Sequence, residues 1–282
     1  MIVRFLGTAA GGGLPQWNCG CPSCQTTRAT GAHRTQDTLA VSGDGAAWYL
    51  VNASPDLRAQ LLAAPELAPP PGTRDTPVRG VLLSTAELDH VLGLPMLREA
   101  SELAVYTSGT VLTALHNVRS VLAAYTEVHW HRLDEGQPVA LAGGLEVRRW
   151  TVGSKRPRYA TDAGDGEWVS ALDIVDGRGA RLLYATCLGE WTDAVAELVD
   201  AADCAVLDGT FATGTELVDV TGRSSSAMGH LPIEHSLAAV RSRTTRILYS
   251  HLNNTNPLAG AGPGAGKLDG VEIAVDGLTL VL

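Results

Sequence analysis

The sequence predicts a layered α/β protein. Short runs rich in β-branched and other apolar residues alternate with Ala/Leu-rich stretches of helical period along all 282 residues. Several apolar runs end in Asp or His, as in α/β proteins whose functional groups gather at strand ends. With 45% hydrophobic and 18% charged residues, the composition is that of an ordinary folded protein. We expect one domain spanning residues 1–282.

The elements follow one another in short units. The first predicted strand ends at a loop with three consecutive glycines, which suit neither a strand nor a helix. Ser-Gly-Asp-Gly at 42–45 indicates a hairpin turn, and the Pro-rich stretch 68–76 indicates a surface connection. Strands are predicted at residues 2–6, 38–41, 46–51, 78–83, 103–107, 145–152, 181–186, 205–207, 246–250 and 271–275. Helices are predicted at residues 91–97, 111–125, 192–201 and 236–242, and a further one opens at Ser54, Pro55 and Asp56.

The net charge and the hydropathy of the chain limit the kinds of molecule that it is expected to bind. A formal charge of −9 argues against nucleic-acid binding, which needs clustered Lys and Arg against phosphate. The densest basic group, at 155–158, is interpreted as a solvated loop or as a clamp for a substrate carboxylate. The first residues lack the pattern of a signal peptide, and apolar runs stop well short of the roughly 18 residues of a membrane span. We therefore expect a cytoplasmic protein.

Ligand-type residues follow three apolar strands. Asp89 and His90 come shortly after the strand predicted at 78–83, and Asp208 and His251 directly follow two later strands. An isolated Asp-His pair is more often a helix cap, but its recurrence at strand ends favours a shared site. Two carboxylates and two imidazoles are a ligand set suited to iron, manganese or zinc. The sequence therefore predicts a metal centre.

A second metal site is predicted at a cysteine cluster. Cys19, Cys21 and Cys24 lie within six positions, which favours convergence on one structural zinc ion in a loop at about 18–33. A disulfide framework fits a reducing cytoplasm poorly. The fourth ligand stays open, with His33 as the nearest candidate. The two remaining cysteines are interpreted as core residues: Cys187 and Cys204.

The pattern around the Asp-His pair resembles the metallo-β-lactamase superfamily, whose motif is His-x-His-x-Asp-His followed by a later His, an Asp and a final His. Thr85 and Glu87 stand in place of the first two motif histidines, and the middle His has no counterpart. The resemblance implies an αββα sandwich of two mixed β-sheets flanked by helices. It also implies a single metal ion, held by the residues of the family's second site: Asp89, His90, Asp208 and His251.

Longer stretches are similar to the coenzyme PQQ synthesis protein B family. They comprise residues 6–13, 15–19, 208–211, 228–233 and 251–257. That family is implicated in making pyrroloquinoline quinone from a Glu–Tyr cross-linked peptide, so the resemblance implies an Fe(II)-dependent, O2-using hydroxylation of a tyrosine ring. Residues 212–226 and the link at 234–235 depart from the family's pattern. A relative acting on another tyrosine- or tryptophan-derived precursor in natural-product assembly is therefore an alternative.

Three further residues are assigned roles. His230 lies where related superfamily members carry a proton-donating His, and a loop His that only forms hydrogen bonds is the alternative. Glu87 is expected either to bind the metal or to act as a base beside it, unless it is a surface residue at the helix start. Thr85 is expected to support a neighbouring ligand through a hydrogen bond.

Two other functions remain open: a hydrolase of phosphodiesters or esters, and a non-catalytic carrier or partner protein in the same pathway. The missing imidazoles disfavour hydrolysis, because that chemistry usually relies on two metal ions. The expected partners are O2 and a small-molecule or peptide-derived tyrosine-like substrate, without nucleic acid or membrane. A homodimer is one option for the oligomeric state.

Overall fold

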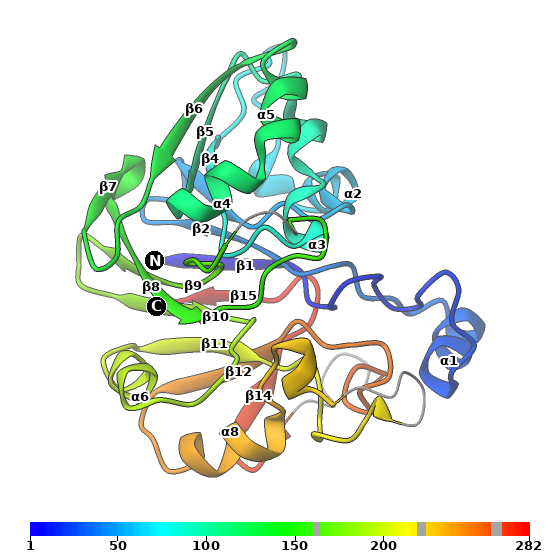
Figure 1. Ribbon diagram of the computed structural model, residues 1–282. Helices are drawn as coiled ribbons and strands as arrows, with labels where there is room; N and C mark the ends of the chain where they lie inside the picture. Colours follow the sequence, from blue (N-terminus) through cyan, green and yellow to red (C-terminus); the bar gives the residue numbers. More distant parts are fainter. Residues whose placement is uncertain (161–163, 219–223, 261–266) are drawn as a thin grey trace.

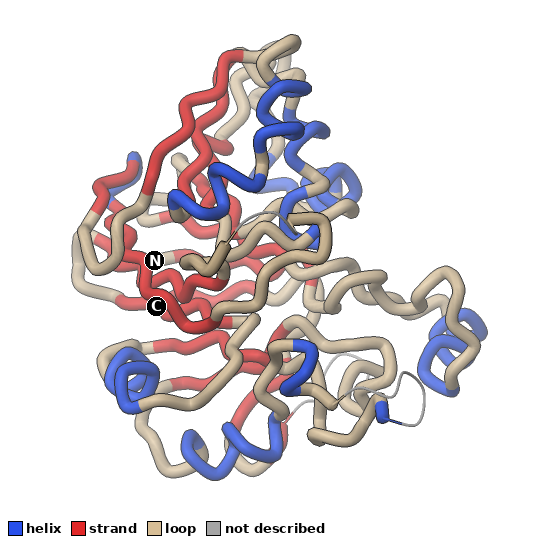
Figure 2. The backbone as a smooth tube through the Cα atoms, in the orientation of Figure 1, coloured by secondary structure: helices blue, strands red, loops and turns tan. Residues whose placement is uncertain are grey.

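Two β-sheets pack face to face in this computed structural model, and helices cover their outer faces (Figure 1). The structure describes residues 1–160, 164–218, 224–260 and 267–282. Figure 2 shows the strands gathered in the middle of the molecule, with most helices outside them. The predicted αββα sandwich is confirmed.

The first sheet has seven strands in the order β15-β1-β2-β3-β4-β5-β6. Strands β15, β1, β2 and β3 pair antiparallel, whereas β3, β4, β5 and β6 pair parallel. The strands are β1 Ile2–Gly7, β2 Thr38–Ser42, β3 Trp48–Val51, β4 Val78–Leu82, β5 Glu102–Thr107, β6 Glu127–Arg132 and β15 Thr279–Val281.

The second sheet has eight strands in the order β13-β14-β12-β11-β10-β9-β8-β7. Its centre is parallel from β10 through β11 and β12 to β14, and the remaining pairs are antiparallel. The strands are β7 Val139–Leu141, β8 Leu145–Gly153, β9 Val169–Asp176, β10 Arg181–Ala185, β11 Cys204–Asp208, β12 Arg246–Ser250, β13 Lys267–Leu268 and β14 Val271–Ile273.

The helices of the described residues are short. They are α1 Pro22–Thr30, α2 Leu57–Leu62, α3 Leu88–Val91, α4 Gly109–Ala114, α5 His116–Leu122, α6 Asp193–Asp200 and α8 Ile233–Val240. None is long and apolar enough to cross a bilayer. Most of them lie against a sheet, but α1 lies to one side of the sandwich on an extended loop (Figure 1).

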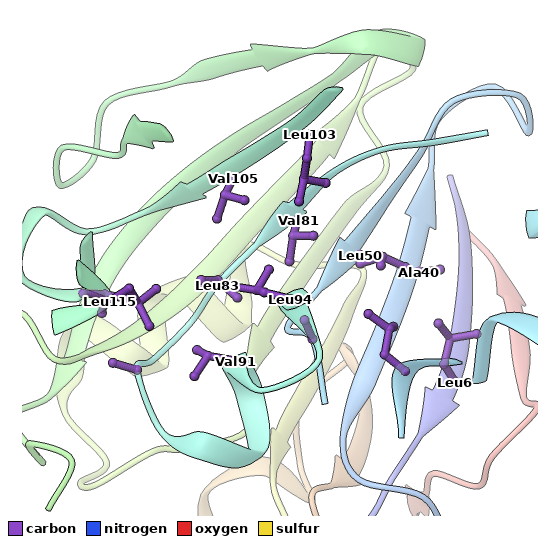
Figure 3. Packing of buried hydrophobic residues seen from close by; sticks show 14 of the residues in the cluster. Leu6, Ala40, Leu50, Val81, Leu83, Val91, Leu94, Leu103, Val105 and Leu115 are labelled. Carbon is purple, nitrogen blue, oxygen red and sulfur yellow. The ribbon is translucent and has the colours of Figure 1, made fainter. Parts of the chain in front are cut away.

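Three apolar layers hold the sandwich together. The layer between the sheets contains both Val3 of β1 and Leu172 of β9. The layer outside the first sheet contains Val81 of β4 and Val91 of α3, which Figure 3 shows among their neighbours. The layer outside the second sheet includes Val199 of α6. Removing this apolar surface from water stabilises the fold by about 25 cal/mol per Å² buried.

Two predicted helices are wrong in extent. The helix predicted at 91–97 is instead α3, which ends at Val91, followed by a 3-10 turn at Leu94–Leu97. Pro95 explains the change, because proline lacks an N–H and disfavours the α conformation of the residue before it. The helix predicted at 111–125 is split into α4 and α5 at Leu115, whose φ of −84° and ψ of 14° interrupt the regular helix.

Several elements were not predicted from the sequence, among them α1, β9 and β15. A signal for α1 is present, because Pro22 occupies its first turn and Gly31 closes it with a left-handed φ of 74°. No apolar period accompanies these caps, since the helix carries mostly polar side chains.

The parallel centre of the second sheet positions the site. Strands β10, β11 and β12 run in the same direction side by side, so their C-terminal ends lie at one edge. The segment after β4 of the first sheet reaches the same edge, where Asp89 lies 3.2 Å from His251. Side chains from both sheets therefore meet at one end of the sandwich.

Candidate metal centre

His90 is buried in the site, and only one of its two ring nitrogens has a hydrogen-bond partner among the described residues. Its Nδ1 lies 2.9 Å from the hydroxyl of Thr85, as expected for a residue that supports a ligand. Its Nε2 is buried and has no hydrogen-bond partner among the described residues. A buried polar atom without a partner costs free energy, so Nε2 is suited to bind a cation.

His251 and Asp89 lie beside it. Nε2 of His251 is 3.2 Å from Oδ2 of Asp89, and the same carboxylate oxygen is 3.9 Å from Nε2 of His90. His251 has a left-handed φ of 62°, which is uncommon for a residue with a Cβ and is found at sites where the surroundings impose it. Nδ1 of His251 lies 2.8 Å from the hydroxyl of Thr210. The structure thus brings Asp89, His90 and His251 together.

Asp208 is the last residue of β11, and its side chain lies next to that of His230. Its Oδ2 is 2.8 Å from Nδ1 of His230, and its Oδ1 accepts a hydrogen bond from the backbone N–H of Thr210 at 3.0 Å. The hydroxyl of Thr210 joins Nδ1 of His230, at 3.1 Å, to Nδ1 of His251. Asp208, His230 and His251 offer ligand atoms within 4.8 Å of one another, close enough to share a metal ion. Proximity alone does not test binding by Asp208, so its role as a metal ligand stays a prediction.

Cys187 belongs to the site, although the sequence interpretation gave it a core position. Its Sγ lies within 4.8 Å of a ring nitrogen of His90 and of His251. The residue is buried, as expected, but it also lines the cavity of the site. It follows the C-terminal end of β10, the same kind of position that led to Asp208 and His251, so a signal was present.

A buried carboxylate fixes the two strand ends that carry Cys187 and His251. Asp37 accepts hydrogen bonds from the hydroxyls of Thr186, at 2.9 Å, and Ser250, at 2.7 Å, and from the hydroxyl of Tyr184. Thr186 and Ser250 each directly precede one of the site residues. Asp37 lies in a loop before β2, and nothing in the sequence indicated this long-range role.

A cavity of about 190 Å³ opens onto these groups. Glu87 and Lys155 line it, and they form an ion pair of 3.4 Å between Oε1 and Nζ. Phe211 and Val169 contribute apolar surface. At Gly11 the chain approaches the site closely, because a Cβ there would lie 3.3 Å from Oδ2 of Asp89. The cavity therefore joins apolar walls, a cation and the carboxylate-imidazole group.

The electrostatics of the site favours an ionised Asp89 carboxylate beside the imidazoles. Burial acts to raise the pKa of Asp89, yet the imidazoles of His90 and His251 hold that pKa well below its usual range. Burial acts to lower the pKa of His251, but the hydrogen bond and charge of Asp89 outweigh burial and raise it. Burial lowers the pKa of His90. An ionised carboxylate beside imidazoles of this kind fits a bound metal cation.

The cysteine cluster converges as predicted, with an amide beside it. The Sγ atoms of Cys19, Cys21 and Cys24 lie within 4.8 Å of one another. Nδ2 of Asn254 lies 3.2 Å from the first sulfur and 3.5 Å from each of the other two. His33, the candidate fourth ligand, is exposed and lines a separate cavity.

The chain is similar to known proteins over its whole length. Residues 47–251 match the family model of the beta-lactamase superfamily domain. Over 100% of both chains, the sequence is 38% identical to coenzyme PQQ synthesis protein B of Azoarcus sp. (strain BH72) and 37% identical to that of Methylococcus capsulatus. The chain belongs to the coenzyme PQQ synthesis protein B family.

A solved member of the coenzyme PQQ synthesis protein B family has the same fold. Zinc-bound PqqB from Methylobacterium extorquens matches with a TM-score of 0.91 and 33% identity, over 100% of each chain. A diphosphatase from the PhnP family matches with a TM-score of 0.72 at 19% identity, covering 100% of this chain and 97% of its own, which shows a common fold alone. The family resemblance inferred from the motifs is confirmed.

Proposed function

We propose that the chain is an Fe(II)-dependent, O2-using hydroxylase of a tyrosine-derived precursor in pyrroloquinoline quinone or related biosynthesis. The observation that supports it best is the buried meeting of Asp89, His90 and His251, with Nε2 of His90 unpartnered among the described residues. These donors fit a ferrous ion, which favours carboxylate and imidazole ligands. When bound, such an ion would supply the activation of dioxygen for attack on an aromatic ring.

The donor set favours one metal over two. Thr85 occupies a position at which the superfamily motif has a histidine, and its hydroxyl instead contacts Nδ1 of His90. Glu87, at the other replaced position, pairs with Lys155. Hydrolysis by two metal ions needs ligands for both, so these replacements disfavour the hydrolase alternative. We therefore assign Glu87 a role beside the metal, where its ion pair would also orient Lys155.

His230 is the proposed proton-transfer residue. Asp208 engages its Nδ1, so Nδ1 holds a proton and Nε2 is left to exchange one with the substrate phenol. The residue is buried and lines the cavity, within reach of a molecule bound there. Asp208 holds the ring orientation and tautomer that this exchange requires.

The cysteine cluster is proposed to hold a structural zinc ion. Three sulfurs that converge beside a polar amide suit a closed site that fixes the loop around α1. Metal analysis of the purified protein should find zinc that survives removal of iron. Cys24→Ser should lose that zinc, and retention of one zinc per chain in this variant would refute the assignment.

The activity is tested by oxygen uptake. Protein reconstituted anaerobically with Fe(II) is mixed with a Glu–Tyr cross-linked peptide or a catechol-like analogue, and then with air-saturated buffer. One oxygen atom enters the ring and the other leaves as water, so ascorbate is added as the two-electron reductant. We expect substrate-dependent oxygen uptake and a product heavier by one oxygen atom. Zinc-loaded protein that cleaves a phosphodiester, with no uptake by the iron form, would favour the hydrolase instead. Inactivity of both forms would favour a carrier.

A further inference from the structure

Cys187 is a buried thiol at the site to which the proposed function gives no role. Its Sγ and one ring nitrogen each from His90 and His251 lie within 4.8 Å of one another, and all three residues are buried. The thiol reaches this place because β10 ends two residues earlier, at the edge of the sheet where β12 delivers His251. The hydrogen bond between Thr186 and Asp37 fixes the residue before it.

The ring nitrogens that remain available identify the metal position. Nδ1 of His90 is occupied by the hydroxyl of Thr85, which leaves Nε2, a buried atom with no partner among the described residues. Nδ1 of His251 is occupied by the hydroxyl of Thr210, which leaves Nε2 beside Asp89. A cation that satisfies both Nε2 atoms therefore lies on the side of Asp89.

Asp208 is committed on the other side of the His251 ring. One of its oxygens faces Nδ1 of His230 and the other accepts the N–H of Thr210. The connection from Asp208 to His251 runs through the Thr210 hydroxyl to Nδ1. The Asp208 carboxylate thus orients the rings of His230 and His251 through their Nδ1 atoms, on the side away from Nε2 of His251.

On the basis of the metal centre proposed above, we propose that Sγ of Cys187 binds the active-site metal together with Asp89, His90 and His251. Asp208 then positions His230 and Thr210 and does not bind the metal. The ligand set becomes one oxygen, two nitrogens and one sulfur. A thiolate is a softer, stronger electron donor than a carboxylate, and this set suits Fe(II), Co(II) or Zn(II) better than Mg(II) or Mn(II).

X-ray absorption distinguishes sulfur from oxygen and nitrogen without any mutation. The cysteine cluster is first filled with zinc, and iron is then added anaerobically, so that the iron edge reports on the active site alone. We expect one sulfur neighbour at roughly 2.3 Å from the iron, as for metal-thiolate bonds. An iron shell made only of oxygen and nitrogen would overturn the assignment of Cys187.

Cobalt spectra with variants give an independent measurement. In zinc-filled protein, Co(II) at the active site should show a thiolate-to-cobalt absorption in the near ultraviolet that Cys187→Ser loses and Cys204→Ala keeps. Cys204 is a matched control, because it is buried in β11 and, among the described residues, belongs to no cluster of side chains that could hold a metal ion. Asp208→Asn should keep both the cobalt and the absorption. An unchanged absorption in Cys187→Ser, or loss of cobalt from Asp208→Asn, would overturn the inference. Wild-type protein that binds no metal beyond the zinc would instead refute the metal centre itself.

Discussion

The hydroxyl of Thr85 lies 2.9 Å from Nδ1 of His90. In the superfamily motif the position of Thr85 carries a histidine, so here a hydroxyl stands at that position and contacts the ring of His90. The contact fixes the ring and leaves Nε2 without a hydrogen-bond partner among the described residues, as the proposed metal site requires. In the proposed single-metal site, the same replacement removes a ligand of the first metal ion and supports a ligand of the second.

Replacing Thr85 by Val should weaken iron binding by about 10- to 100-fold, because a ligand without its hydrogen-bonded support is poorly oriented. Thr85→Ser keeps the hydroxyl and should bind iron nearly as tightly as the wild type. Competition with a chromophoric chelator measures both affinities. Equal affinity of the Val and Ser variants would show that the hydroxyl does not matter.

Removal of the Asp37 carboxylate should destabilise the end of the second sheet. Asp37→Ala leaves the hydroxyls of Thr186 and Ser250 without their acceptor, and we expect a loss of about 3 kcal/mol in the free energy of unfolding. Urea denaturation measures it. The exposed Asp75→Ala serves as control and should change stability by about 0.5 kcal/mol or less. A similar small change in Asp37→Ala would contradict the structural role.

Substitution of His230 should separate proton transfer from metal binding. His230→Gln should keep its iron content but lower kcat by about 10²- to 10⁴-fold, the usual contribution of a general acid or base. Asp208→Asn should lower kcat as well, because it disturbs the tautomer of His230. Single-turnover rates and metal analysis provide the two readouts. Full activity in His230→Gln would leave the proton transfer to another group.

Lys155 should bind a carboxylate of the substrate. Its ammonium lines the cavity and pairs with Glu87 at 3.4 Å. Lys155→Met should raise KM by about tenfold with little change in kcat, because it removes binding common to the ground and transition states. Lys155→Arg should retain most of the affinity. The methyl ester of the substrate lacks the charged carboxylate. If Lys155→Met raised KM for this ester by the same factor as for the substrate, a role of Lys155 in carboxylate binding would be excluded.

The site residues that follow an apolar strand could be predicted from the sequence. Asp89, His90 and His251 were found because runs of buried residues precede them, and the structure brings them together. The loop with Cys19 was found from spacing alone. In contrast, Asp37 acts through hydroxyls that lie far away in the sequence, and no local pattern indicates such a partner.

Pairing across strands also explains a missed element. Strand β9 carries Asp173, which weakens the apolar pattern that predicts a buried strand. In the folded protein Arg181 of the neighbouring β10 binds this carboxylate through two contacts of 2.7 Å. The ion pair with Arg181 compensates the burial of the Asp173 carboxylate, and this partner is known only from the strand register.

The most direct test of the metal centre is the iron content of a double variant. Wild-type protein and His90→Ala/His251→Ala are stripped, reconstituted anaerobically with Fe(II) after zinc loading, and analysed for both metals. We expect one iron and one zinc per wild-type chain, and zinc without iron in the double variant. Iron retained in the double variant at the wild-type level would contradict this expectation.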